Sequence, residues 1–204
     1  SPKRLVMAYQ MGIFPWFNPS EPVLWWSPDP RFVLFPNEIY VSKNMRRILR
    51  NKKFEITFDQ DFKGVIQGCR DIYRPGQNGT WISDEIIDSY TELFHKGFVH
   101  SVEVRQEGKL VGGLYGGVLG KCFFGESMFA KVSDASKAGF IALVKNLAAH
   151  HFELVDCQVY TSHLESLGAR MIPRIQFLKV LNKHNQTPLQ DQSWADMFHT
   201  DLTF

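Results

Sequence analysis

Three side chains capable of polar chemistry lie inside two segments that are otherwise apolar. Glu126 lies within residues 121–130 (KCFFGESMFA), and Asp156 and Gln158 lie within residues 154–160 (LVDCQVY). Both segments read as buried strands, in which an unpaired polar group costs roughly 2–7 kcal/mol. Strands distant in sequence can lie side by side, which would bring the three groups together beside the apolar side chains of their own segments. Those apolar side chains are Phe123, Met128 and Val155. The pattern predicts a pocket for an apolar molecule that carries an amine.

The composition is that of a soluble globular protein with one domain, or with one domain and a small appendage. The chain has 204 residues, 44% hydrophobic and 22% charged, with a net charge of +2. No run approaches about 18 apolar residues and no basic-then-apolar leader is present, so neither a membrane span nor a signal peptide is predicted. The three cysteines form no C-x-x-C pair and have no histidine at metal-ligand spacing. This usage predicts a reducing compartment and no metal site.

The elements that must position the polar residues follow from hydrophobic periodicity, capping residues and turn signals. Helices are expected at 2–10, 42–51, 62–72, 84–97, 134–150 and 173–183, with a short one from 162. Strands are expected at 31–35, 54–58, 99–104, 110–118, 121–129 and 154–160. The strands from 99 to 129 read as consecutive antiparallel neighbours, with turns at 107–108 and 119–120. The order predicts an α+β fold in which helices cover a mostly antiparallel sheet.

Two stretches each allow two interpretations. Residues 12–31 hold five of the ten prolines and three of the five tryptophans, which excludes a long helix or a central strand. This stretch is either a hydrophobic clasp over the core or an aromatic platform on which a nucleotide base stacks. Six basic residues and no acidic residue occupy 43–53, which is either a solvated helix face or a patch that contacts phosphates.

Eight blocks spread along the chain resemble a known family, the leucyl/phenylalanyl-tRNA protein transferases of bacteria. They are 8–10 (AYQ), 12–17 (GIFPWF), 25–31 (WWSPDPR), 79–82 (GTWI), 111–116 (VGGLYG), 125–129 (GESMF), 156–158 (DCQ) and 166–169 (SLGA). Members of that family carry a few dozen further residues before the position of Ser1. The resemblance therefore implies a small, incomplete N-terminal domain at 1–32 and a catalytic domain at 33–204.

The resemblance implies an enzyme that moves Leu or Phe, and Met less readily, from aminoacyl-tRNA to the α-amine of proteins that begin with Arg or Lys. Proteins extended in this way are marked for degradation by the N-end rule. The family fold is similar to that of the GCN5-related N-acetyltransferases. The resemblance further implies a cytoplasmic monomer that uses no cofactor, no metal and no membrane.

The family's catalytic pair corresponds to Asp156 and Gln158. The resemblance implies that the Asp156 carboxylate holds the Gln158 amide, whose oxygen accepts a proton from the attacking amine. Residues two apart on a strand point to the same face, so the contact is geometrically possible. Because an amide oxygen is barely basic, orienting the amine is the safer role for Gln158. The alternative for the pair is a structural hydrogen bond within the sheet.

Other family positions correspond to substrate contacts. Glu126 is expected to pair with the cationic first residue or the α-ammonium of the acceptor, the alternative being an ion pair with an arginine of the protein itself. Trp16 and Trp81 match the tryptophans that hold the terminal adenosine of the tRNA by stacking. Five residues match the pocket for the Leu or Phe side chain, although without the family each reads as core: Leu114, Phe123, Met128, Leu143 and Val155.

Two rival functions fit parts of the sequence. An acyl-CoA-dependent N-acetyltransferase needs a glycine-rich turn before the helix that binds the CoA pyrophosphate, whereas 131–136 (KVSDAS) contains none and carries an acid there. A non-enzymatic RNA-binding module would explain the tryptophans and the basic run but would leave Glu126, Asp156 and Gln158 without a purpose. A catalytic role for Cys122 or Cys157 is disfavoured, because no histidine or other base lies at convincing spacing.

Overall fold

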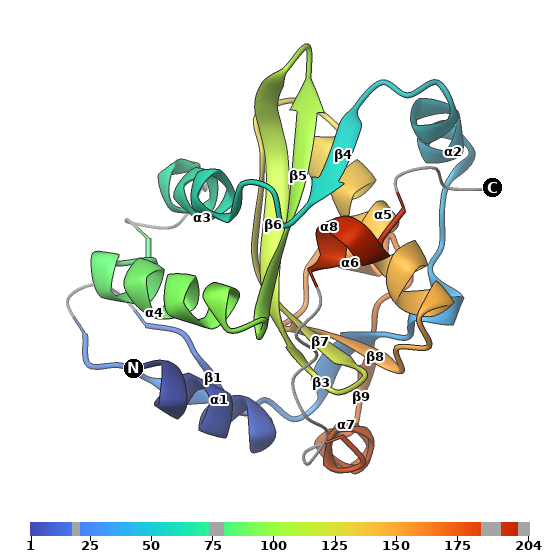
Figure 1. Ribbon diagram of the computed structural model, residues 1–204. Coiled ribbons are helices and arrows are strands. Elements are labelled where there is room, and N and C mark those ends of the chain that lie inside the picture. The colour runs from blue at the N-terminus through green and yellow to red at the C-terminus, as the bar shows by residue number, and fades with distance from the viewer. Residues whose placement is uncertain (18–20, 74–79, 185–192, 200–204) are drawn as a thin grey trace.

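The computed structural model describes residues 1–17, 21–73, 80–184 and 193–199. Its centre is a seven-stranded sheet with the strand order β4-β5-β6-β7-β8-β3-β9, accompanied by a two-stranded sheet of β1 and β2 (Figure 1). The large sheet consists of β3 (Arg31–Leu34), β4 (Glu55–Phe58), β5 (Val99–Gln106), β6 (Lys109–Leu119), β7 (Cys122–Ala130), β8 (Leu154–Gln158) and β9 (Arg170–Ile172). The small sheet consists of β1 (Phe14–Pro15) and β2 (Trp25–Trp26).

The strands from β4 to β7 pair with antiparallel neighbours, as do β3 with β8 and β9 with β3. The turn between β5 and β6 places Glu107 and Gly108 at positive φ, and Gly120 does the same between β6 and β7. The β7–β8 pair is parallel, because the helix α5 (Ala135–Ala149) crosses over between them. The predicted α+β fold with a mostly antiparallel sheet is confirmed, with one parallel pair.

Helices cover both faces of the sheet (Figure 1). One core forms under α1 (Pro2–Gln10), α3 (Phe62–Asp71), α4 (Asp84–His95) and α7 (Arg174–Asn182). The other forms under α2 (Lys43–Arg50), α5, α6 (Ser162–Glu165) and α8 (Trp194–Met197). A short 3₁₀ helix, η1, spans Pro36–Glu38. The helices expected from periodicity are all present, whereas β9 and α8 were not predicted, because three or four residues carry too little periodic signal.

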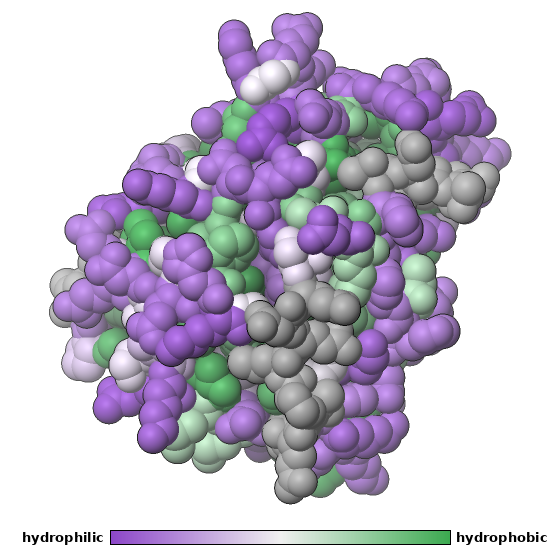
Figure 2. Space-filling view, in the orientation of Figure 1, coloured by the Kyte–Doolittle hydropathy of each residue, from purple (hydrophilic) through white to green (hydrophobic). Residues whose placement is uncertain are grey.

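The face of the molecule in Figure 2 is mainly hydrophilic, with small and separate hydrophobic areas. Many of the larger apolar side chains are instead buried in the two cores, where Phe123, Phe124 and Phe177 are inaccessible to solvent. Among the helices of the described residues, none combines the length and hydrophobicity that a membrane span requires.

Candidate active site

A cavity of about 430 Å³ opens where β7 and β8 separate. The two strands pair only from Cys122 to Phe124 and from Leu154 to Asp156, after which β7 continues to Ala130 against β6 alone. Backbone that diverges in this way leaves the side chains beyond the last pair facing a gap. Glu126, Asp156 and Gln158 all line this cavity, so the structure brings together the three polar residues singled out in the sequence.

Glu126 is the centre of a hydrogen-bond network. Its Oε1 accepts from the Tyr9 hydroxyl at 2.5 Å and from Gln158 Nε2 at 2.9 Å. Its Oε2 accepts from the Tyr90 hydroxyl at 2.8 Å, and the two hydroxyls lie 2.6 Å apart. These partners are two phenols and an amide. Within the described residues, the alternative of an ion pair between Glu126 and an arginine of the protein is therefore not what the structure shows.

Burial of the Glu126 carboxylate raises its pKa to about 7, since the hydrogen bonds from the tyrosines and Gln158 only partly offset the cost of desolvation. The charge of Asp156 raises that pKa further. Burial also raises the pKa values of Tyr9 and Tyr90 well above their usual range, and the neighbouring Glu126 charge adds to the effect. Both phenols therefore stay protonated and act as donors. The site thus holds a carboxylate that changes charge near neutral pH and would gain from a cationic ligand.

The carboxylate of Asp156 is occupied by groups other than the Gln158 side chain. Arg31 Nε donates to Oδ1 at 2.8 Å and Arg31 Nη2 donates to Oδ2 at 2.6 Å, and both side chains are buried. The backbone N–H of Gln158 also donates to Oδ1, at 2.9 Å. The expectation that this carboxylate holds the Gln158 side-chain amide is thereby corrected: it holds the Gln158 backbone, and the amide nitrogen binds Glu126.

The conformation of Gln158 explains this correction. Its φ is 64°, in the left-handed region that non-glycine residues seldom adopt. The β3–β8 register shifts at the same point, between Phe32 and Val33. A left-handed residue at the end of a strand breaks the alternation of faces, so the same-face argument from spacing does not apply. The side chain turns toward β7 and reaches Glu126 across the gap.

The apolar wall of the cavity contains four of the five residues predicted for it. Leu114, Phe123, Met128 and Val155 line the cavity. Leu143 does not line it within the described part of the chain, because it is fully buried in the core on α5. Phe140, one turn earlier on the same helix, lines the cavity in its place. The two residues share a helix face, so position along α5 and not helical phase decides between them.

Trp16 and Trp81 line the same cavity although they come from different parts of the chain. Trp16 follows β1 and is 43% exposed, and its carbonyl accepts from the Trp26 indole at 2.7 Å. Trp81 precedes α4 and packs edge-on against Tyr90, with ring centroids 6.5 Å apart. The predicted tryptophan pair is thus brought to one pocket. In the proline-rich stretch Phe14 belongs to the core, as a clasp would require, while Trp16 remains accessible, and its stacking on a base stays a prediction.

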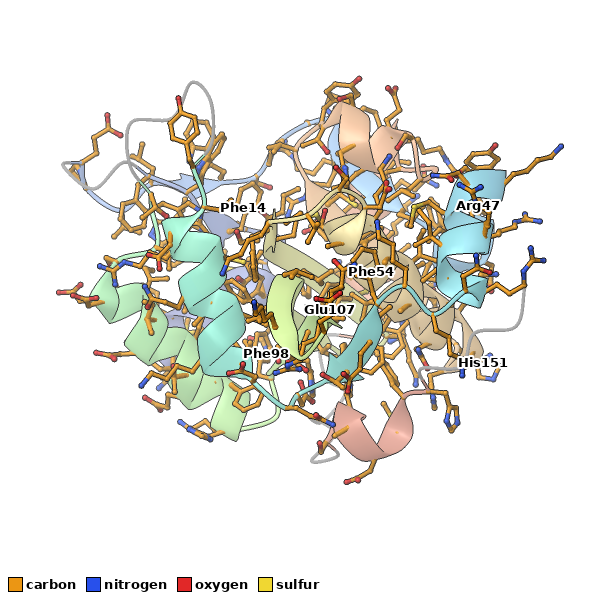
Figure 3. The ribbon with its side chains drawn as sticks, turned by 90° about the horizontal axis from the view of Figure 1, so that it is seen from above. Phe14, Arg47, Phe54, Phe98, Glu107 and His151 are labelled. Atoms are coloured by element: carbon orange, nitrogen blue, oxygen red, sulfur yellow. The ribbon has the colours of Figure 1, made fainter. Side chains whose placement is uncertain are left out.

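The predicted basic run forms α2, whose N-cap Ser42 accepts from the Met45 backbone. Figure 3 shows Arg47 on α2 at the side of the molecule opposite Phe14 of β1. The basic helix therefore does not belong to the cavity wall and could contact only a ligand large enough to reach across the molecule.

The two cysteines nearest the site are poor nucleophiles. Burial raises the pKa of Cys122 to about 12, and burial also raises the pKa of Cys157 far above its usual value. Both thiols therefore stay protonated at neutral pH. In the described ranges, no three His, Cys, Asp or Glu side chains are grouped so as to hold a metal ion.

Three residues of the network were missed in the sequence: Tyr9, Arg31 and Tyr90. Tyr9 and Arg31 lie within the AYQ and WWSPDPR blocks, so the blocks contained the signal but gave no role for it. Tyr90 occupies a buried position on α4 and reads as an ordinary core aromatic. Only their contacts with Glu126 and Asp156 identify them as part of the site.

Comparison with known proteins identifies two family models in this chain. The model described as leucyl/phenylalanyl-tRNA protein transferase matches residues 33–182, and the model of the corresponding N-terminal domain matches residues 1–29.

Curated relatives carry the same name. A leucyl/phenylalanyl-tRNA–protein transferase of Syntrophus aciditrophicus is 53% identical over 195 residues, covering 96% of this chain and 82% of its own. One from Flavobacterium johnsoniae is 58% identical over 180 residues, which cover 88% of this chain and 85% of the relative. Among solved structures, L-PGS from Bacillus licheniformis matches with 9% identity and a TM-score of 0.41, covering 80% of this chain and 55% of its own. This last similarity is too slight to carry an argument.

Proposed function

We propose which substrates this chain uses, given that it belongs to the leucyl/phenylalanyl-tRNA protein transferase family and is thus an aminoacyltransferase that acts from tRNA to protein. The enzyme transfers Leu or Phe, and Met less readily, to the α-amine of proteins that begin with Arg or Lys. Proteins modified in this way enter N-end-rule degradation. The observation that carries this proposal is the Glu126 carboxylate, which lines an apolar cavity and takes only uncharged protein partners among the described residues.

The aminoacyl end of the tRNA occupies the cavity in this proposal. The Leu or Phe side chain packs against Leu114, Phe123 and Met128, and the unbranched Met128 adapts to either shape. Trp16 and Trp81 hold the terminal adenosine by stacking, since unpaired 3′ bases are what proteins read most easily in RNA. The phosphates of the acceptor stem extend toward basic α2.

The acceptor's cationic first residue pairs with Glu126 in this proposal. The α-amine nitrogen attacks the ester carbonyl carbon, the amide bond forms, and the bond to the ribose oxygen breaks. The amine proton ends on that ribose oxygen, directly or through water. The ester is already activated and an α-amine titrates near ~8, so positioning dominates the rate. Gln158 orients the amine through its amide oxygen while its Nε2 donates to Glu126.

The remaining expectations fit this proposal. In this proposal the sheet with its parallel β7–β8 pair is of the GCN5-related N-acetyltransferase type, with a small N-terminal domain at 1–32, whose last two residues already begin β3 of the sheet, and a catalytic domain at 33–204. In this proposal the enzyme acts in the cytoplasm, where its aminoacyl-tRNA substrate is found. It acts as a monomer without a cofactor. The helix α5 carries Asp134 at its N-cap, where the pyrophosphate of CoA would need a donor, which supports tRNA over CoA as the acyl source.

The proposed function is tested by label transfer. Purified protein is incubated with radiolabelled Phe-tRNA or Leu-tRNA and with two peptides that differ only in a first residue of Arg or Ala. Label should appear in the Arg peptide alone. If neither peptide is labelled and charged and uncharged tRNA bind equally well, the chain is an RNA-binding module.

The pH dependence of transfer should reveal Glu126. We expect kcat/KM for the Arg peptide to rise about tenfold per pH unit below the amine pKa near ~8, because only the neutral amine attacks. Below about pH 7 the slope should double, because Glu126 also becomes protonated and loses the charge that binds the acceptor cation. The pH profile of Glu126→Gln should keep the single slope throughout. Equal profiles for the two proteins would remove Glu126 from acceptor binding.

Replacement of Trp81 by Ala should weaken aminoacyl-tRNA binding. Loss of a stacked base costs about 1–3 kcal/mol, so KM for Phe-tRNA should rise roughly 5- to 150-fold while KM for the peptide stays unchanged. Trp25→Ala is the control, because Trp25 is an exposed tryptophan of β2 that does not line the cavity. Equal KM values for both variants would show that Trp81 does not stack on the adenosine.

A further inference from the structure

The Arg31 guanidinium is bound on every side within the protein. Its side chain is 1% exposed at the start of β3, between the rings of Phe14 and Phe177, whose centroids lie 4.7 and 4.6 Å from its Cζ. Nε and Nη2 form the two-point contact with Asp156 at 2.8 and 2.6 Å, and Nη1 donates to the Gly12 carbonyl at 3.1 Å. Arg31 itself does not line the cavity, so it acts only through its partners.

Stability alone gives little reason to keep this ion pair. Two charges inside a protein lose their hydration, and apolar residues of similar volume often serve stability as well or better. A buried pair of this kind therefore points to a role in geometry.

That geometry is the turn at Gln158. Asp156 Oδ1, held by Arg31 Nε, accepts the Gln158 backbone N–H at 2.9 Å. Gln158 adopts a φ of 64°, which a glutamine keeps only when its surroundings fix it. From this conformation the side chain reaches Glu126 at 2.9 Å. With Arg31 absent, the carboxylate would lose the two donors that fix its direction, and the turn would lose its fixed acceptor.

The same guanidinium also contacts the segment that carries Trp16. Gly12, whose carbonyl binds Nη1, has a φ of 71° and ends the turn after α1, and Phe14 of β1 covers the guanidinium. Trp16 follows β1 directly and lines the same cavity as Gln158. The Arg31 side chain thus connects the segment that carries Trp16 to the turn that carries Gln158.

We propose that Arg31 is a positioning residue for aminoacyl transfer, which fixes Gln158 through the Asp156 carboxylate and sets the distance between Gln158 and the Trp16 segment. This inference rests on the proposed function. Asp156 serves the same purpose: its side chain is fully buried, and its two oxygens bind Arg31 and the Gln158 backbone, so it steers Gln158 and does not touch the attacking amine.

The decisive comparison uses two variants. Arg31→Lys keeps the charge but offers no planar fork, so it cannot hold both carboxylate oxygens and the Gly12 carbonyl in the same geometry. The double variant Arg31→Met with Asp156→Leu replaces the pair by apolar groups and leaves no buried charge. Because a small misplacement of a reacting group can cost about 100-fold, we expect kcat with Phe-tRNA and the Arg peptide to fall about 10- to 100-fold in both variants.

Two further measurements separate positioning from stability. The double variant should melt close to the wild-type protein despite its lost turnover. Hydrogen exchange, followed by mass spectrometry on the peptide that contains Gln158, should speed up in both variants relative to the peptide of the control strand β5. Guanidinium ions added to Arg31→Ala, if it folds, should restore part of the turnover.

Two results would overturn the proposal. Turnover within twofold of wild type in Arg31→Lys, or in a folded double variant, would overturn the proposal. Failure of both variants to fold would overturn it as well, because Arg31 would then serve stability. Label transfer by the wild-type protein reports separately on the proposed function, and the exchange measurement needs no substrate, so the two failures can be told apart.

Discussion

Glu126→Gln is expected to abolish most of the preference for acceptors that begin with Arg or Lys. The variant keeps the shape but cannot carry a charge, and its single amide oxygen can accept on one side of the network, either from Tyr9 and Gln158 or from Tyr90. Loss of one partner of a desolvated charge pair costs about 2–5 kcal/mol, so kcat/KM for the Arg peptide should fall roughly 30- to 4,000-fold. The Ala peptide, which the wild-type protein is expected to leave unlabelled, should stay unlabelled. Label transfer to the two peptides, measured side by side, gives the result directly.

A loss of stability in Glu126→Gln should not be the cause of its lower activity. The folded-state pKa of Glu126 is raised to about 7, so above that pH the ionised carboxylate costs folding free energy, and this cost is relieved as pH falls. At about pH 8 the amide variant should therefore unfold at the same temperature as the wild-type protein or a higher one. Glu55→Gln, on the exposed side of β4, is the matched control. If Glu126→Gln still prefers Arg over Ala, another group must read the acceptor.

Asp156→Ala is expected to destabilise the protein more than any other substitution in the site. It leaves the Arg31 guanidinium, 1% exposed, without its counter-ion. Breaking a buried pair by removing one partner costs about 3–5 kcal/mol. For a domain of this size the melting temperature should fall by roughly 6–20 °C. Thermal and denaturant unfolding both measure the effect, and transfer activity should be lost at temperatures where the variant is still folded.

Asp88→Ala provides the comparison for this prediction. Asp88 lies on the exposed face of α4, so its removal should change the free energy of unfolding by less than about 0.5 kcal/mol. Equal melting temperatures for the two variants would mean that Asp156 is not needed to compensate Arg31. The account of the buried pair would then be wrong.

Local sequence signals were sufficient for most of the fold. The expected helix at 2–10 is α1, and the basic segment capped by Ser42 is α2. The three strands from Val99 to Ala130 appear as the predicted antiparallel neighbours, because turns at Gly108 and Gly120 leave short connections. The strand β9 could not be predicted, because its three residues follow no pattern and become a strand only by pairing with β3.

The site was predictable as a set of residues but not as a set of contacts. Polar groups inside apolar strands, together with the eight family blocks, identified Glu126, Asp156 and Gln158. The family resemblance implied a contact between the side chains of Asp156 and Gln158 that the spacing along β8 would allow, whereas the left-handed conformation of Gln158 sends them apart. Likewise, hydrophobicity alone does not distinguish Leu143 from Phe140, because the two lie one turn apart on the same helix and only the placement of α5 along the sheet determines which one lines the cavity.

The sequence by itself therefore determined the longer elements, the family and three polar residues of the site, Glu126, Asp156 and Gln158, since these depend on residue type and local order. Tertiary structure alone decided their partners. Tyr9 lies 117 residues from Glu126 along the chain, and Arg31 lies 125 residues from Asp156. Such contacts exist only after β3 has joined β8 in the sheet and α1 has packed beside α4, because a hydrogen bond depends on position in space and not on spacing along the chain.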